Sequence, residues 1–479
     1  MKSDSSNLFN HNNLVLFLLA ICFCNSLVVH GQNEVDGPNF IIIFADDLGY
    51  GDLGSYGHPS IATPNLDKLA EEGQKWTNFY AAASVCTPSR ASILTGRLSV
   101  RSGMTSHKRR VLFPDSKYGL PRSEITLAEK LREAGYRTAC IGKWHLGHKE
   151  RYLPTNNGFD YYFGIPYSND MDRVGELDSQ EYWSQPDSLI TTENFNVPLL
   201  RNTEIIERPA NQNTITKRYS EEAVSFIKRS NGEPFFLYLA HSLPHVPLFA
   251  SERFIGKSRR GLYGDVVEEI DHGIGLILKT LKEEGLYKNT VVVFTSDNGP
   301  WLTFKKNGGS AGLLRAGKGT TWEGGMRVPG IFWGPGIVKP GTRYDIGSTM
   351  DLYTTFISMA GIDLPEDRII DGFDISQTLQ TGKPSSRKQL FYYRGTDIYA
   401  LRYGAYKAHF ITEGAYGEFG GKETHNPPLL YNLAEDPSET TNIADKHPDI
   451  LKEILTVLDR HKANLVPGPD QMTARDKRP

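Results

Sequence analysis

The stretch that decides the fold is residues 40–44, FIIIF, which lead through Ala45 into the acidic pair Asp46 and Asp47. A short, continuous apolar run is typical of a strand that is buried on both faces of a sheet. Similar runs recur along the chain, and patterns typical of amphipathic helices separate them. This alternation predicts an α/β protein whose mostly parallel sheet is flanked by helices.

The other elements of this first part are predicted in the same way. Apolar runs predict further strands at residues 138–141, 235–239, 291–295 and 330–333. Helical patterns predict helices at residues 126–134, 216–229, 263–284 and 348–360. Residues 153–212 show little periodicity and are rich in Asn, Asp, Tyr and Pro, so we expect loops that cover a functional site.

The pattern changes after residue 360. Short strand-like segments with turns between them predict an antiparallel sheet, at residues 390–393, 398–403 and 405–411. An amphipathic helix at residues 448–463 closes this part. We therefore expect an N-terminal domain that carries the site (residues 36–345), a smaller C-terminal α+β subdomain (residues 346–467) and a disordered tail (residues 468–479).

Composition narrows the function. The chain has 479 residues, of which 39% are hydrophobic and 23% charged, as in ordinary globular proteins. Its formal net charge of −3 gives no overall attraction to nucleic acid or to an anionic membrane. We expect no nucleic-acid partner, and an anionic ligand would have to be recognised locally.

The first 31 residues predict a secretory signal peptide, because Lys2 precedes an apolar run that ends near Cys24 and small residues follow. A lipid anchor on Cys24 is the alternative. No transmembrane segment is expected in the mature chain. The mature chain has no Asn-x-Ser/Thr acceptor, which favours an exported bacterial protein, periplasmic or secreted, over a glycosylated lysosomal one.

A cysteine motif stands at residues 86–96, CTPSRASILTG. Pro88 suits a first helical turn and Gly96 suits a helix end, so Cys86 should lie at the N-terminus of a short helix. Backbone N–H groups there favour negative charge, and Arg90 lies one turn further on. The motif predicts an anion-binding pocket with a modifiable sulfur. A buried structural cysteine, or a disulfide with Cys140, is the alternative.

Polar residues follow four of the predicted strands, and sites in open α/β sheets form beyond the carboxyl ends of strands. These residues are Asp46 and Asp47, Lys143 and His145, His241 and His245, and Asp297 and Asn298. The three acids and the amide form an oxygen-rich set suited to Ca²⁺ or Mg²⁺. Taken singly, Asp46-Asp47 could equally be a turn or a helix cap, and Asp297-Asn298 a turn. Together they predict an active site.

Residues 86–96 match C-x-P-S-R-x-x-x-L-T-G, the signature of the type I sulfatases. Other segments resemble that family in the family's order: FADDLGYGDLGSYGHP, GKWHLGH, FGIPYSND, HSLPH, FTSDNG, GLLRAGKGTTWEGGMRVP and LLYNLAEDPSETTNIA. The resemblance is closest to the branch of arylsulfatase A and N-acetylgalactosamine-6-sulfatase. It implies an alkaline-phosphatase-like fold and a sulfuric ester hydrolase.

The resemblance also implies a nucleophile and a metal. Cys86 would be oxidised to formylglycine (3-oxoalanine) by a formylglycine-generating or an anaerobic sulfatase-maturating enzyme, and a hydroxyl of the hydrated aldehyde would attack sulfur. A divalent cation, Ca²⁺ with Mg²⁺ as the alternative, would be bound by the modified Cys86 and by Asp46, Asp47, Asp297 and Asn298. The substrate would be a sulfated carbohydrate, such as a polysaccharide.

Further roles follow from the matched positions. A sulfate ester needs fixed positive charge, a proton donor for the leaving alcohol and a strong nucleophile. Arg90 and Lys143 would hold the hydrate, and Asp297 would help to activate it. His241 and Lys318, the latter in the glycine-rich residues 317–325, would contact the sulfate, with His241 as proton donor. His145 would take a proton to expel sulfate, and Ser168 would contact the substrate.

Specificity is predicted from fewer signals. Anionic groups on a glycan could be met by Arg109, Arg110, Lys305 and Lys306, although these could equally be solvated surface charges. Trp301 could stack on a sugar ring. Two rival functions stay open: a phosphatase or phosphodiesterase of the same superfamily, with two zinc ions, and a non-catalytic relative that binds sulfated glycans.

Overall fold

The predicted strand at residues 40–44 is β1 (Asn39–Ala45) in the computed structural model, which describes Met1 and residues 37–476. All of its side chains are buried. It lies between β7 (Phe235–Ala240) and β8 (Thr290–Ser296) and pairs with both in parallel. This central position explains why the run is apolar throughout. The predicted signal peptide, with Cys22 and Cys24, lies outside the described residues.

The large sheet contains ten strands within the part of the chain that the structure describes. The others are β2 (Gln74–Tyr80), β3 (Arg137–Gly142), β4 (Tyr161–Gly164), β5 (Leu199–Arg201), β6 (Glu204–Glu207), β9 (Arg327–Trp333) and β10 (Gly341–Ser348). Their order across the sheet is β10-β2-β9-β8-β1-β7-β3-β4-β5-β6. The central block from β8 to β4 is parallel, while β9, β5 and β6 run antiparallel to their neighbours. The predicted mixed, mostly parallel sheet is confirmed.

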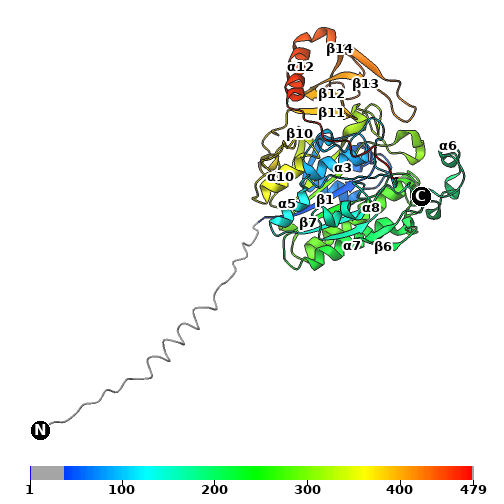
Figure 1. Ribbon diagram of the computed structural model, residues 1–479, viewed down its shortest axis with the longest axis vertical. Coiled ribbons are helices and arrows are strands. Elements are labelled where there is room, and N and C mark those ends of the chain that lie inside the picture. The colour runs from blue at the N-terminus through cyan, green and yellow to red at the C-terminus, as the bar shows by residue number, and fades with distance from the viewer. Residues whose placement is uncertain (2–36, 477–479) are drawn as a thin grey trace. The chain divides into compact units, whose positions relative to one another are not determined.

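Helices cover both faces of this sheet (Figure 1). Ile41 and Ile43 of β1 belong to the core that also contains side chains of α7 (Ile215–Arg229) and α8 (Leu262–Glu283). Phe40 points the other way and stacks on Phe356, with ring centroids 4.2 Å apart. The remaining α-helices of this part are α2 (Pro64–Glu72), α3 (Cys86–Thr95), α4 (Ser99–Ser102), α5 (Leu127–Glu133), α6 (Ser179–Trp183), α9 (Glu323–Met326), α10 (Asp351–Met359) and α11 (Ser376–Thr381).

A second sheet follows in the chain, and Figure 1 shows it in orange with α12 (Pro448–Ala463) in red. Its antiparallel strands are β11 (Gln389–Arg394), β12 (Asp397–Tyr403), β13 (Tyr406–Thr412) and β14 (Glu423–Asn432), in that order. The predicted antiparallel sheet and closing helix are confirmed. The predicted domain boundary at residue 345 falls inside β10, which pairs with β2 of the large sheet.

Some strands escaped prediction because they are short or interrupted. Residues 153–212, predicted as loops, contain β4, β5 and β6 at one end of the large sheet. With three or four residues each, these strands are too short to show a period of two. β14 contains Pro427 and Pro428, which an edge strand tolerates but which hide it from pattern analysis.

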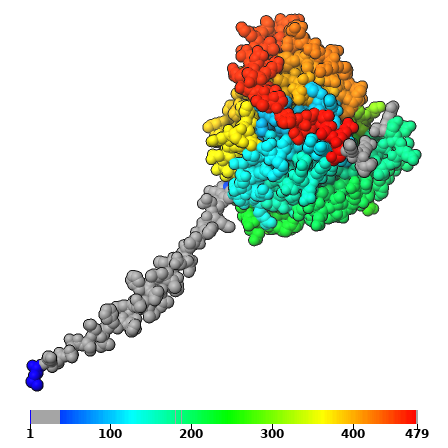
Figure 2. Space-filling view, viewed as in Figure 1, coloured from blue at the N-terminus to red at the C-terminus, as the bar shows by residue number. Residues whose placement is uncertain are grey.

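The expectation of a disordered tail is wrong for residues 468–476. The backbone N–H of Gly468 donates to Val100 O, and that of Gln471 donates to Gly103 O. The side chain of Met472 is fully buried. Figure 2 shows this C-terminal segment, in red, lying across the cyan surface formed by residues around 100–150. The segment was not recognised as ordered because its sequence is polar. Backbone hydrogen bonds hold it in place, and these produce no hydrophobic pattern in the sequence.

Buried charges join the second sheet to the glycine-rich residues 317–325. Lys407 of β13 donates from Nζ to Glu323 Oε1 (2.9 Å) and to Thr321 O (2.9 Å), and Glu439 Oε1 lies 2.9 Å from the same nitrogen. Burial opposes ionisation of Glu323, but Lys407, Arg327 and Arg402 together outweigh it and lower its pKa to about 2. His409 Nε2 lies 2.7 Å from Glu439 Oε1, and burial together with Lys407 lowers the His409 pKa to about 4.

These pKa values predict a loss of stability in acid. His409 is neutral in the folded protein down to about pH 4, whereas in the unfolded chain it is protonated below about 6.5. The free energy of unfolding should therefore fall as the pH drops from 6.5 to 4. In a His409→Gln variant, whose side chain can still donate to Glu439, the free energy of unfolding should fall by up to about 3 kcal/mol less than in the unmutated protein over this pH range. Urea midpoints at pH 7 and pH 4.5 measure the difference, and equal losses in both proteins would contradict it.

Candidate active site

Cys86 lies at the first turn of α3, as the sequence predicts. Val85 precedes the helix in an extended conformation, and Gly96 ends it with a φ of 66°. The side chain of Cys86 is buried, and its Sγ lies 3.3 Å from Asp46 Oδ1. Cys86 and Cys140 are both free, so the alternative disulfide is absent. Burial and the nearby Asp297 and Asp46 raise the pKa of the Cys86 thiol, which makes the unmodified side chain a poor nucleophile.

The predicted oxygen ligands come together because they follow neighbouring strands. β1 and β8 pair in register up to Ala45 and Ser296, so Asp46 and Asp47 end beside Asp297 and Asn298. One ligand atom from each of Asp46, Asp47, Cys86 and Asp297 lies within 4.8 Å of the others. Asp47 adopts a φ of 64°, a strained value for a residue with a side chain.

This cluster fits a hard divalent cation. Asn298 donates from Nδ2 to Asp47 Oδ1 (2.7 Å), while its own Oδ1 is buried without a hydrogen-bond partner. Burial, with the charge of Asp46, raises the pKa of Asp297 to about 7 despite Arg90. A free amide oxygen and carboxylates that are costly to ionise together are what such a cation would stabilise.

Three cations enter the same site from three other segments. Arg90 donates from Nε (3.1 Å) and Nη2 (2.9 Å) to Asp297 Oδ2. Lys143, just after β3, donates from Nζ to Asp46 Oδ2 (2.5 Å) and to Ser168 Oγ (3.0 Å). Lys318 donates from Nζ to Asp47 Oδ2 (2.6 Å). All three cationic side chains are buried, and each carboxylate of the cluster pairs with at least one of them, since Arg90 Nη2 also lies 3.6 Å from Asp46 Oδ1.

The two histidines of the predicted proton steps are buried and neutral. His145 has a φ of 59°, its Nε2 lies 2.9 Å from Leu112 O, and its Nδ1 has no partner. Because a carbonyl only accepts, Nε2 carries the proton and Nδ1 is free to accept one. Burial, together with Lys143, lowers the pKa of His145. His241 follows β7 directly, its Nδ1 is also unpartnered, and burial lowers its pKa to about 3.

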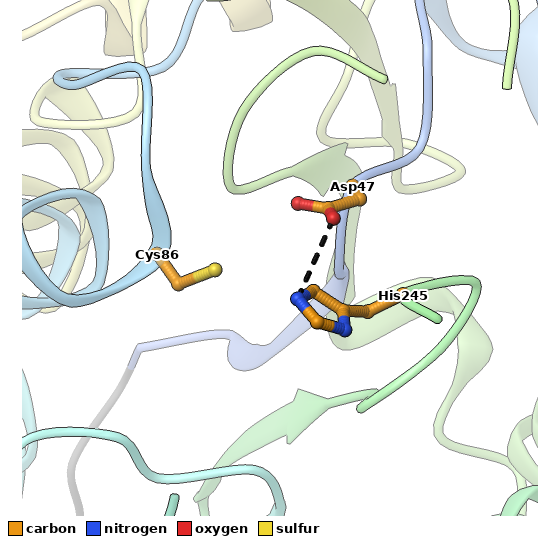
Figure 3. A group of neighbouring side chains, drawn as sticks. All are labelled: Asp47, Cys86 and His245. Carbon is orange, nitrogen blue, oxygen red and sulfur yellow. Dashed lines mark ion pairs between the residues drawn. The ribbon is translucent and has the colours of Figure 1, made fainter. Parts of the chain in front are cut away.

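His245 belongs to the site, although the sequence analysis placed it at a strand end without a role. Figure 3 shows its ring facing Asp47, with Cys86 on the other side of the gap. Nδ1 lies 2.5 Å from Val246 O, so this nitrogen carries the proton and the bare Nε2 faces Asp47 Oδ2 at 3.6 Å. Two acceptors that face each other are favoured when a cation lies between them. The sequence signal that could have identified His245 as a site residue was its position as the second histidine of the segment HSLPH.

One wall of the site is aromatic. Trp301 lies under the Lys318 ammonium, which is 4.2 Å from its ring centroid. Its ring also contacts Tyr416, with centroids 4.7 Å apart. Tyr416 lies between β13 and β14 and was not predicted as a site residue, because only the tertiary fold brings that turn to the site. Asp170, near Lys143, is a second residue that was missed: its Oδ1 is buried without a partner, and burial raises its pKa.

Of the basic residues predicted to contribute to specificity, Arg110 lies at the site and Arg109 lies away from it. Arg110 reaches the site, because its Nη2 donates to Gly319 O beside Lys318. Arg109 does not: it pairs with Asp115 and lies over the ring of Phe113. The side chains of Lys305 and Lys306 are exposed.

Known proteins resemble this chain in sequence and in fold. A model of the sulfatase family matches residues 38–362, and a model of the C-terminal region of aryl-sulfatase matches residues 385–479. The chain is 40% identical to N-acetylgalactosamine-6-sulfatase of Canis lupus familiaris over 92% of this chain and 88% of that protein. It is 40% identical to arylsulfatase A of Homo sapiens over 91% of this chain and 90% of that one. The solved structure of the PsFucS1 sulfatase from Pseudoalteromonas sp. superposes with a TM-score of 0.79 at 30% identity, covering 91% and 93% of the two chains.

The carboxyl ends of the strands form an oxygen-rich centre lined by three cationic side chains. The chain belongs to the sulfatase family and is a sulfatase, an enzyme that hydrolyses sulfate esters. Among the described residues, no helix is both long and apolar enough to cross a membrane.

The carboxylate cluster predicts a stability response to divalent cations. Adding Ca²⁺ to protein treated with a chelator should raise the melting temperature. At a free Ca²⁺ concentration of 100 times the dissociation constant, the free energy of unfolding should increase by about 2.7 kcal/mol. An Asp47→Asn variant should lose most of this rise. Asp52→Asn is the matched control, because Asp52 is buried in the same loop but bonds Tyr263. An equal rise in all three proteins would exclude the cluster as the metal site.

Proposed function

We propose that this sulfatase removes sulfate from a sulfated carbohydrate, using a formylglycine made from Cys86 and a Ca²⁺ ion. The observation that carries the proposal is the position of Cys86 Sγ: at the N-terminus of α3, 3.3 Å from Asp46 Oδ1 and within the cluster that includes Asp47 and Asp297. A buried thiol with a raised pKa gives little chemistry by itself. The same position suits a modified nucleophile.

The two groups that the chain must acquire have distinct roles. Formylglycine would supply a hydrated aldehyde as the nucleophile toward sulfur, and Ca²⁺, with Mg²⁺ as the alternative, would supply positive charge. Asp46, Asp47, Asp297 and Asn298 would hold the ion together with the modified Cys86. A formylglycine-generating or an anaerobic sulfatase-maturating enzyme would carry out the modification.

The chain's own residues then bind the ester and move protons. Arg90 and Lys143 hold the hydrate and balance its charge, and Lys318 places positive charge at the sulfate oxygens. His241 donates a proton to the leaving alcohol, and an anionic sulfate beside its ring raises the low pKa that burial gives it. His145, with its free Nδ1, takes the proton that accompanies release of sulfate. Ser168 is held by Lys143 and contacts the substrate.

A carbohydrate substrate is supported by the relatives and by the site wall. The relative from Canis lupus familiaris is named for a sulfated amino sugar. Trp301 and Tyr416 offer flat apolar rings beside Lys318, a surface that suits a sugar ring. With residues 1–31 as a signal peptide, the enzyme would act outside the cytoplasm, in the periplasm or the medium.

Substitution of Cys86 tests the nucleophile. Cys86→Ser should lower sulfate release from the best sugar in a panel of sulfated mono- and oligosaccharides by at least about 10³-fold. Cys140→Ala is the matched control, since Cys140 is also free and buried and should not matter for turnover. A Cys86→Ser protein with full activity would refute the mechanism.

The mass of the tryptic peptide of residues 76–90 tests the modification directly. Protein made in its own host should carry an aldehyde in place of the Cys86 thiol. Metal analysis of the same sample should find one calcium for each chain. An unmodified thiol would favour the glycan-binding alternative, and two zinc ions would favour the phosphatase alternative.

A further inference from the structure

A cavity of about 200 Å³ opens beside the loop that leads into α3. Val85, the neighbour of Cys86, lines it, and so do the basic residues Arg110, Arg394 and Lys422. Pockets of about 300–1,000 Å³ hold drug-sized ligands, so this smaller volume suits a single sugar unit. None of the proposed catalytic residues lines it.

Arg110 forms a wall shared by this cavity and the active site. Its Nη2 donates to the carbonyl oxygen of Gly319 at 2.5 Å, one residue after Lys318. Its guanidinium lies 5.1 Å from the ring centroid of Tyr416, which in turn contacts Trp301. The backbone N–H of Gly319 donates to Ser84 O (2.7 Å). This hydrogen bond connects the Lys318 loop (residues 317–325) to the segment before Cys86. A ligand bound at Cys86 and Lys318 would therefore have the cavity beside it.

The cavity carries an unneutralised positive charge. Within residues 37–476, Arg110 forms no ion pair with a carboxylate. Arg394 pairs with Glu413 (3.1 Å), and burial together with the charge of Arg110 lowers the pKa of Arg394. Lys422 at the rim pairs with Asp397 (3.6 Å). The two guanidinium groups thus repel each other beside an open volume, and an anion between them would remove that repulsion.

We propose that this cavity binds an oxyanion, a carboxylate or a second sulfate, on a further sugar of the glycan that is being desulfated. The inference rests on the proposed function and makes its substrate narrower: a polyanionic glycan rather than an isolated monosulfated sugar. Arg110 and Arg394 are the specificity residues, and neither takes part in the chemical steps.

Binding measurements on a protein that cannot turn over its ligand test the proposal. In a Cys86→Ala background, calorimetry at fixed ionic strength compares N-acetylgalactosamine 6-sulfate with a chondroitin 6-sulfate trisaccharide. The trisaccharide should bind at least about tenfold more tightly, and Arg110→Ala should remove about tenfold of that preference. Arg394→Gln serves as a second variant. Lys108→Ala is the matched control, because it removes an equal, exposed charge from the same loop outside this cavity.

A carboxyl-reduced trisaccharide distinguishes the two sources of the oxyanion. If reduction abolishes the preference, the cavity binds the carboxylate; if the preference persists, it binds the second sulfate. The proposal is overturned if the trisaccharide binds no better than the monosaccharide, or if Arg110→Ala and Arg394→Gln weaken both ligands equally. Failure of the proposed function would look different: the unmutated enzyme would release no sulfate from any sugar in the panel.

Discussion

The structure depends on a balance of buried charge at the carboxyl ends of the central parallel strands. Asp46, Asp47 and Asp297 would be costly to bury alone, and so would the three cations that meet them. Asp46 and Asp47 follow β1 and Asp297 follows β8, while α3, the loop after β3 and residues 317–325 bring the three cations, so the six charges cancel. A divalent cation then adds two positive charges to a neutral site, which makes it attractive to an anionic ester.

This balance also explains what could be predicted from sequence. The strand that ends in Asp46 and Asp47 is a local pattern, and so is the strand that ends in Asp297 and Asn298. Because neighbouring parallel strands end at one edge, the pattern alone was enough to place these side chains together. The helix start at Cys86 was equally local, since it depends on Pro88 and Gly96.

Features that depend on distant contacts could not be predicted in this way. Tyr416 reaches Trp301 only because the second sheet packs near residues 317–325, and no periodicity near residue 416 reports that contact. Both His245 and Asp47 could be picked out in the sequence, but the contact between them could not be predicted. The β4–β6 strands and the segment at residues 468–476 are held by backbone hydrogen bonds, which leave little trace in side-chain pattern.

The tie between Lys407 and the Lys318 loop has a consequence for synthesis of the protein. Cys86 is made early, but the loop that carries Lys318 is anchored by Glu323, Lys407 and Glu439, and Glu439 is made 353 residues after Cys86 (439 minus 86). At ~5–20 residues per second, that interval lasts on the order of 20–70 s. A thiol that is almost completely enclosed in the finished fold is therefore open to a modifying enzyme for much of the time that the chain is being made.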